Sequence, residues 1–534
     1  MNIMKKITLS VLFLSSLSTV VSANSTAIFA DEHNPNNRVL AIDYKNMELI
    51  DENPVEGSLN HHADVIGNLK NAKYFMMVPK GSTFVTFRKV SDRSFVKKLN
   101  LPFQPRSGDA YNSKYNLTLL TSSNRPSAVI IDNNTLKIVG RAGFNIACNK
   151  QTLSEVFSDS IFDTPNCTAS DFGGSQISGH PIWLNSDTFA ILDRSNRFVH
   201  VYGIKKVDGE WKTTLKNSIK TNSSLHQMIP DPKHKNIFYG MTEGNTNTKT
   251  LARMYKFKYT HGKLKTIGKR DLILTKGLLF FSKTYKGIGG HNLYITPDNR
   301  YLYGATATGA VFVVSTRTLS IKNAFNAGKG AGHVNFMKNG SYGAVTNHQA
   351  PYVTIFNWKT HRFVKNIYTN FDKEGIASLL HSHAPYIEGK YFYNFWTDGG
   401  VFYRINLNTL TLDNSIYVGG VPIQGNYYKS FESSESGQSD DTTITTNKKS
   451  YNKYEKVTVT YENMEGNRKD WIGIFRADSN NKWYNVVAWR WTKGREEGKA
   501  VFRYLPRGNY EVRAFFNNSY HPEASSSFTV KGWR

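Results

Sequence analysis

Cysteine is nearly absent from this 534-residue chain, which holds only Cys148 and Cys167. Two cysteines exclude both a disulfide-dense scaffold and a four-cysteine metal site, so the fold must rest on hydrophobic burial. A chain of this length supplies enough burial for two domains or more. Acidic residues are also scarce, with 41 against 67 lysines and arginines. The formal charge of +26 is spread along the chain and predicts attraction to anionic surroundings.

Long hydrophobic runs are missing apart from one near the N-terminus. Two lysines precede an apolar stretch over 7–21, and small residues follow as far as Ala23. This order is typical of a secretory signal peptide, because the apolar stretch is too short and too rich in serine to span a bilayer comfortably. The alternative is an N-terminal membrane anchor. We therefore expect a signal peptide at 1–23 and an exported protein, periplasmic or secreted, that begins near Asn24.

Export constrains the cysteines and the partners. In an oxidising compartment, Cys148 and Cys167 most simply form a disulfide that closes a loop. Nucleic acid is then an improbable partner for the basic surface. We expect an anionic envelope or extracellular partner instead, such as lipid headgroups, acidic polysaccharide or another protein.

Most short enzyme signatures are missing too. The sequence has no phosphate-binding glycine loop, no Gly-x-Ser-x-Gly elbow, no zinc-protease helix motif and no c-type haem attachment pair. A copper-radical oxidase needs a cysteine bonded to tyrosine, whereas both cysteines here are expected to pair with each other.

What the sequence does contain is a repeat. The same pattern occurs in segments 131–136, 314–319 and 405–410. Each contains the end of a strand, a polar turn and a Thr-Leu pair that precedes the next strand. Segment 291–304 shows a second recurring piece, in which a short strand, a Pro-Asp-Asn turn and an aromatic strand follow one another. Together they make a four-stranded unit, the blade of a β-propeller. About seven such blades are expected, with starting points near His61, Asp109, His180, His226, His291, His333 and His381.

The predicted organisation is therefore all-β, with a propeller followed by a small sandwich. We expect an N-terminal segment at 24–54, the propeller at 55–428 and a linker at 429–444, whose stretch 433–441 lacks apolar residues. Residues 445–534 alternate apolar and polar positions in short runs, which favours a β-sandwich of immunoglobulin type.

Two family resemblances follow from these motifs. Residues 55–425 resemble bacterial propellers with YVTN-type repeats, whose relatives include the propellers of nitrous oxide reductase and of the haem d1 nitrite reductase. Segments 470–475, 505–513 and 517–520 resemble SKICH-like sandwich domains. That second resemblance implies an appended interaction domain without catalytic residues. Its aromatic residues suggest carbohydrate or peptide binding, although most of them are expected in the core: Trp483, Trp489, Trp491, Phe516 and Tyr520.

Histidine recurs at the starts of the blades. Only fifteen histidines occur in the chain, yet they return at one position of the repeat. The innermost strand of each blade faces the central channel, so residues at its start lie at one level and converge. Converging imidazoles without carboxylates or thiolates favour copper or zinc. The predicted metal-binding set is His61, His62, His180, His226, His291, His333, His348, His381 and His383.

The histidine pattern resembles the ring of copper ligands in the nitrous oxide reductase propeller, where a His-His pair would correspond to His61 and His62. The chain has no cupredoxin domain with paired cysteine ligands, so the resemblance does not extend to that reaction. The second blade also starts without a histidine.

Other functions remain open at this point. The histidines can instead hydrogen-bond between blades or surround a channel that holds water or an organic ligand. In that case the protein is a binding or scaffold protein without a metal. A third possibility is haem d1 binding, which needs a wide channel with basic groups.

Overall fold

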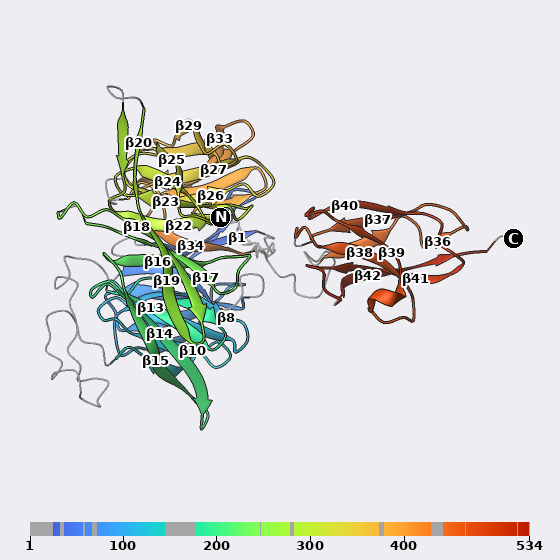
Figure 1. Ribbon diagram of the computed structural model, residues 1–534, viewed down its shortest axis with the longest axis horizontal. Helices are drawn as coiled ribbons and strands as arrows, with labels where there is room; N and C mark the ends of the chain where they lie inside the picture. The colour runs from blue at the N-terminus through green and yellow to red at the C-terminus, as the bar shows by residue number, and fades with distance from the viewer. Residues whose placement is uncertain are drawn as a thin grey trace, which may run out of the picture. The chain divides into compact units, whose positions relative to one another are not determined.

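The computed structural model describes residues 25–31, 37–56, 59–66, 72–144, 177–245, 247–277, 282–372, 379–428, 442–464, 466–520 and 522–532. The chain divides into two units, Met1–Ser430 and Phe431–Arg534, and each is described by itself (Figure 1). Strands dominate both units, which confirms the predicted all-β class. No helix in the described ranges is long and apolar enough to cross a bilayer. The predicted signal peptide and both cysteines lie outside these ranges, so export and the disulfide stay predictions.

Seven groups of the first unit each contain four consecutive, paired strands. The first three are β4 (Leu59–Ile66), β5 (Tyr74–Lys80), β6 (Phe84–Lys89) and β7 (Phe95–Asn100); β8 (Pro105–Asn112), β9 (Leu117–Ser122), β10 (Ala128–Asp132) and β11 (Lys137–Ala142); and β12 (Ile182–Asn185), β13 (Thr188–Asp193), β14 (Phe198–Val207) and β15 (Glu210–Lys220). A single parallel pair, Gly140 with Trp211, joins the second and third of them into one eight-stranded sheet.

The other four groups of this kind continue the series along the chain. They are β16 (Leu225–Pro230), β17 (Ile237–Thr242), β18 (Arg253–Thr260) and β19 (Lys263–Asp271); β22 (Gly290–Ile295), β23 (Tyr301–Thr306), β24 (Ala310–Ser315) and β25 (Ile321–Asn326); β26 (Ala331–Phe336), β27 (Tyr342–Asn347), β28 (Tyr352–Asn357) and β29 (Arg362–Tyr368); and β30 (Tyr386–Glu388), β31 (Tyr391–Trp396), β32 (Val401–Asn406) and β33 (Thr411–Tyr417), with the short helix η4 (Thr397–Gly399) after β31. A separate two-stranded ribbon, β20 (Ile273–Lys276) with β21 (Lys283–Lys286), follows β19.

An eighth group of four strands is assembled from both ends of the first unit. Its order is β3-β2-β1-β34, with β1 at Thr26–Asp31, β2 at Arg38–Asp43, β3 at Glu48–Pro54 and β34 at Pro422–Tyr428. The segment expected before the propeller therefore supplies three strands of a blade. The predicted count of about seven becomes eight in the described part of the chain, because this blade has no starting point of its own in the repeat.

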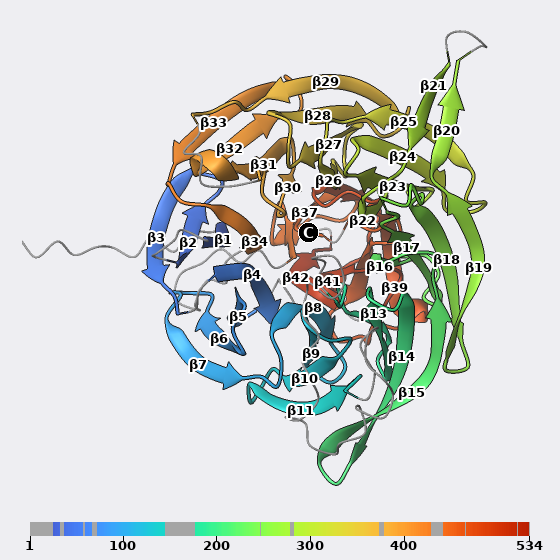
Figure 2. The same ribbon diagram turned by 90° about the vertical axis from the view of Figure 1, so that its left-hand side faces the viewer.

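The blades are arranged around a central axis (Figure 2). The first strand of each consecutive blade and β34 of the eighth lie nearest the axis, and β3, β7, β11, β15, β19, β29 and β33 lie at the rim. Successive inner strands contact one another, for example β4 with β8 and β22 with β26. The first unit is a β-propeller.

The hydrophobic core of the propeller is a ring of separate clusters between neighbouring blades. Middle strands such as β9, β13 and β24 are buried at every position, because both of their faces are covered by adjacent blades. Outer strands such as β7 and β33 are largely exposed and polar.

The Thr-Leu restarts detected in the sequence are tight turns with a leucine in the left-handed conformation. Leu136, Leu319 and Leu410 have φ of 51°, 57° and 56°. The amide of Leu410 donates to the carbonyl of Asn406 at 2.8 Å, and the other two leucines make the same bond. The Asn406 side-chain oxygen accepts hydrogen bonds from the next turn amides, which stabilises the turn.

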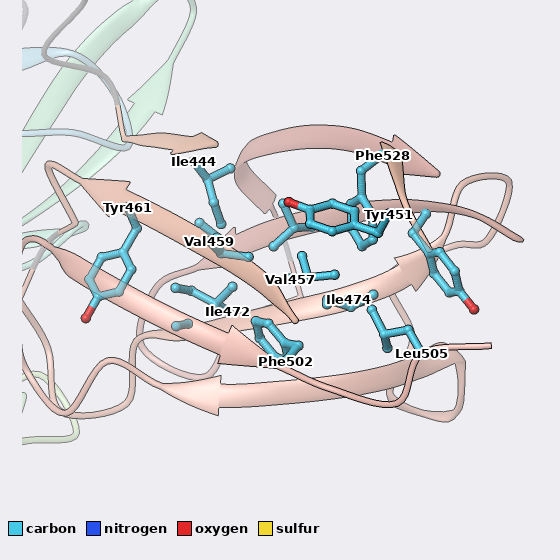
Figure 3. Close-up of a cluster of buried hydrophobic side chains, with 14 of the residues drawn as sticks. Ile444, Tyr451, Val457, Val459, Tyr461, Ile472, Ile474, Phe502, Leu505 and Phe528 are labelled. Carbon is cyan, nitrogen blue, oxygen red and sulfur yellow. The ribbon is translucent and has the colours of Figure 1, made fainter. Parts of the chain in front are cut away.

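The second unit consists of two sheets around one core (Figure 3). Ile444, Val459 and Phe502 from one sheet pack against Ile474 and Phe528 from the other. The small sheet has the order β35-β37-β40 and the larger one β36-β42-β41-β38-β39. The strands are β35 (Thr443–Thr446), β36 (Ser450–Tyr451), β37 (Val457–Glu462), β38 (Trp471–Arg476), β39 (Val486–Trp491), β40 (Gly498–Phe502), β41 (Gly508–Phe515) and β42 (Pro522–Val530), with the short helix η5 (Trp483–Asn485) before β39.

Candidate metal centre

The blade-start histidines lie at β-bulges. The register of the inner strand shifts around His226 in β16, around His291 in β22 and next to His333 in β26. A bulge inserts one residue into the strand and redirects its side chain. The same irregularity at the same place in successive blades explains why these imidazoles converge near the axis.

Four histidines come together. His291 of β22, His333 of β26, His348 just after β27 and His383 just before β30 each offer a ring nitrogen, and these four nitrogens all lie within 4.8 Å of one another. Ring centroids are 5.2 Å apart for His291 and His333 and 4.6 Å apart for His348 and His383. We call these four residues the histidine cluster.

The spacing is near that of a metal site. A tetrahedral ion with metal–nitrogen bonds of about 2.0 Å places its ligands about 3.3 Å apart. The distances among the four ring nitrogens therefore need to shorten by at most about 1.5 Å, and rotation of the side chains can supply this change. Four imidazoles without a carboxylate or thiolate suit copper or zinc.

Two members of the cluster have an open ring nitrogen. Nδ1 of His333 contacts the Tyr294 hydroxyl at 2.8 Å, and Nδ1 of His348 lies 3.0 Å from the carbonyl oxygen of His381 and can donate to it. The Nε2 atoms of His333 and His348 are buried and have no hydrogen-bond partner among the described residues. Because a buried polar atom without a partner is costly, each of these nitrogens is available to a ligand. Tyr294 and the His381 carbonyl hold the two rings in the orientation required.

His180 and His226 extend the cluster on one side. Their ring centroids are 5.1 Å apart, and that of His226 is 5.0 Å from His291. Nδ1 of His180 lies 2.8 Å from Asp109, and Nδ1 of His226 lies 3.2 Å from Glu243. Both are held by carboxylates and lie outside the group of four nitrogens. The second blade, which begins without a histidine, thus contributes a carboxylate that orients the next blade's histidine.

His381 was expected to bind metal, but its ring makes hydrogen bonds within the fold. Its Nδ1 lies 2.6 Å from the carbonyl oxygen of Asn347 and its Nε2 lies 2.8 Å from the Thr369 hydroxyl. Both ring nitrogens are occupied, so the ligand role predicted for His381 is corrected to a structural one. His61 and His62 lie on β4, but their side chains are outside the described part of the structure.

Gly332, the residue before His333, belongs to the site but is not among the residues predicted from the sequence. A Cβ at this position would lie 2.7 Å from Nε2 of His348 and 3.0 Å from Cδ2 of His291. Glycine is therefore needed here so that the rings from two other strands can approach. The signal was visible as Gly-His at three blade starts, 179–180, 290–291 and 332–333.

Gly332→Ala is expected to weaken metal binding about tenfold while the propeller stays folded, because the new methyl group displaces the His348 ring. Isothermal titration with Cu²⁺ or Zn²⁺ measures this. Gly240→Ala is the matched control, since its Cβ meets Leu225 and Phe257 in an apolar cluster away from the histidines. Equal affinities of the two variants would refute this role of Gly332.

Burial keeps His291, His333 and His348 of the histidine cluster neutral. Desolvation, followed by the charges of neighbouring histidines and arginines, lowers the pKa of His291 well below 6.5. Burial likewise lowers the pKa of His333, that of His348 to about 4 and that of His381 to about 3. Neutral imidazole is the form that binds a metal, so these rings are ready for a cation at neutral pH.

The same shifts predict a pH-dependent stability for the metal-free protein. In the unfolded chain these histidines bind protons with a pKa near 6.5, whereas His348 and His381 in the folded protein do so only near 4 and 3. The unfolded chain binds more protons in this interval, so the free energy of unfolding should fall as the pH drops from about 6.5 to about 3. Urea titrations of the metal-free protein across this range test the prediction, and a rise in stability on acidification would contradict it.

Comparison with known proteins shows which fold the chain has but does not assign it to a family. No family model matches the sequence, and no curated protein matches it. Among solved structures, the chain is similar to the dihydro-heme d1 dehydrogenase NirN in complex with DHE, at 10% identity and a TM-score of 0.54, covering 76% of this chain and 75% of that one. It is also similar to Sqt1 of Saccharomyces cerevisiae, at 8% identity and a TM-score of 0.50, covering 76% and 95%. Both likenesses support a β-propeller.

Proposed function

We propose that the propeller binds one transition-metal ion through His291, His333, His348 and His383. The observation that carries this proposal is the meeting of four ring nitrogens within 4.8 Å, supplied by three successive blades. The open Nε2 atoms of His333 and His348 support it. Copper is the metal we favour, because copper stands highest in the affinity series for nitrogen ligands.

The role proposed for the bound ion is metal handling or redox chemistry. Four protein ligands fill a tetrahedral site, and such a site holds its ion firmly. If one of the four stays unbound, an open position remains for a substrate or a small molecule. His226 lies beside His291 and His180 lies beside His226, each fixed by a carboxylate, and both would be near such a ligand.

The test is a competition titration of the purified, metal-free protein with Cu²⁺ and Zn²⁺ in the presence of a chelator of known affinity. One equivalent should bind, with a preference for copper. Absorption and electron paramagnetic resonance spectra of the Cu²⁺ form should report nitrogen ligands. A folded protein that binds neither ion would disprove the proposal.

Haem d1 is the competing ligand for the same channel. The likeness to NirN is too distant in sequence to transfer its ligand, and shows the fold alone. Haem added to the metal-free protein should leave its absorption spectrum that of free haem, whereas a shifted Soret band would favour the haem hypothesis.

Export is the second part of the proposal. A metal site made of histidines works in the same oxidising compartment that the predicted signal peptide at 1–23 implies. N-terminal sequencing of the protein secreted by its own cells should begin near Asn24. A chain that keeps residues 1–23 would contradict export by cleavage.

A further inference from the structure

The larger sheet of the second unit has an apolar face on the side away from its core. Ile472 and Ile474 of β38 point into the core shared by the two sheets, whereas Trp471 and Phe475 of the same strand join Phe515 in a separate cluster. A sandwich normally exposes polar residues on this side. The Trp471 and Phe515 rings stack at 4.2 Å. This outer cluster is therefore built into the sheet.

Aromatic side chains around the outer cluster reach the solvent. Exposed fractions are 52% for Trp483, 73% for Tyr484, 38% for Trp491 and 41% for Tyr520. Trp483, Trp491 and Tyr520 form one connected group with Trp471 and Trp489 through ring contacts, at 5.7 Å between Trp483 and Trp489, 5.1 Å between Trp489 and Trp491 and 5.9 Å between Trp471 and Tyr520. A connected, exposed aromatic surface of this kind marks an interaction site.

A strand edge borders the same surface. Strand β39, which carries Trp489 and Trp491, is the last strand of its sheet and pairs only with β38 among the described strands. An edge strand presents unpaired backbone groups to which another extended chain can add. The rings next to it lie at 63° and 80° to one another, so they do not form a flat stacking platform.

The net positive charge of the second unit favours an acidic partner. Residues 442–532 contain sixteen lysines and arginines against nine aspartates and glutamates. Lys482, Arg490 and Lys493 are exposed beside or on β39. We propose that β39 and its aromatic surface bind an extended, acidic segment of a partner protein, which adds to the sheet as a further strand. The inference is independent of the metal site.

The experiment uses the full-length protein and three synthetic ten-residue peptides. The first alternates glutamate and valine, the second alternates lysine and valine, and the third is the first with methylated backbone nitrogens. Only the first should bind, and it should quench tryptophan fluorescence. Binding of the lysine peptide, equal binding of the methylated peptide or no binding of the first would each overturn the proposal.

Variants locate the site. Trp491→Ala and Trp483→Ala should each weaken binding of the acidic peptide at least about tenfold, since exposed aromatic residues dominate such interfaces. Tyr504→Ala is the matched control, because Tyr504 is 72% exposed but has its ring contact with Tyr454, outside the aromatic surface. Vesicles of anionic lipid and an acidic polysaccharide serve as competitors. If either binds through Trp491 in preference to the peptide, the partner class assigned here is wrong.

Discussion

His333→Ala is expected to lower the affinity of the protein for copper or zinc at least about 100-fold. His333 is buried, comes from the inner strand β26 and offers a Nε2 atom that the fold leaves without another partner. Its removal leaves three imidazoles and a gap that no other described donor of the cluster fills. Losing a direct ligand should cost more than the 10- to 100-fold that outer-shell changes typically cost. Competition titrations of the two proteins measure the difference.

His234→Ala is the control for this experiment. The His234 side chain is 65% exposed and pairs with Asp231 in the turn between β16 and β17. Its replacement should leave metal affinity unchanged. If His333→Ala binds as tightly as the native protein while its circular dichroism is also native, the ion is held elsewhere.

Phe29→Ala should lower the free energy of unfolding by about 3–5 kcal/mol, the usual cost of emptying a buried phenylalanine site. Phe29 lies on β1 in the closing blade, is fully buried and packs at 4.7 Å on Phe395 of the preceding blade and at 5.7 Å on Tyr427 of β34. It therefore connects strands from both ends of the first unit. Denaturant unfolding of the metal-free protein provides the measurement.

Phe95→Ala is the matched control for the closing blade. Phe95 lies on the outer strand β7 and is 55% exposed, so its removal should change stability by less than about 0.5 kcal/mol. A similar loss for both variants would mean that the closing blade contributes no special stability.

The sequence predicts the repeat well because most blades are consecutive. The seven starting points chosen near histidines and Asp109 fall at or within five residues of the first strands of seven blades, from β4 to β30. The eighth blade could not be found from the repeat. Its inner strand β34 comes from the end of the propeller and its other strands from the beginning, so no complete unit exists along the chain.

The site is predicted in outline, and its details depend on local geometry. Repetition of histidine at blade starts indicates convergence, and His291, His333 and His383 do converge. The sequence could not show that His381 turns towards Thr369 and Asn347, because hydrogen bonds formed only in the fold decide its direction. It also could not show that Gly332 makes room for His348.

The carboxylates beside the outer histidines depend on the same geometry. Asp109 served only as the start of a blade in the sequence, and its contact with His180 joins residues 71 positions apart. Such a pair has no signature in a single sequence. The inner strands of neighbouring blades, β8 and β12, bring the two residues together.

Crystals of the full-length protein soaked in Cu²⁺, with data collected at the copper absorption edge, test the central claim most directly. The account predicts one anomalous peak per chain, about 2.0 Å from ring nitrogens of His291, His333, His348 and His383. A peak located away from these four residues, or no peak in a fully soaked crystal, would contradict it.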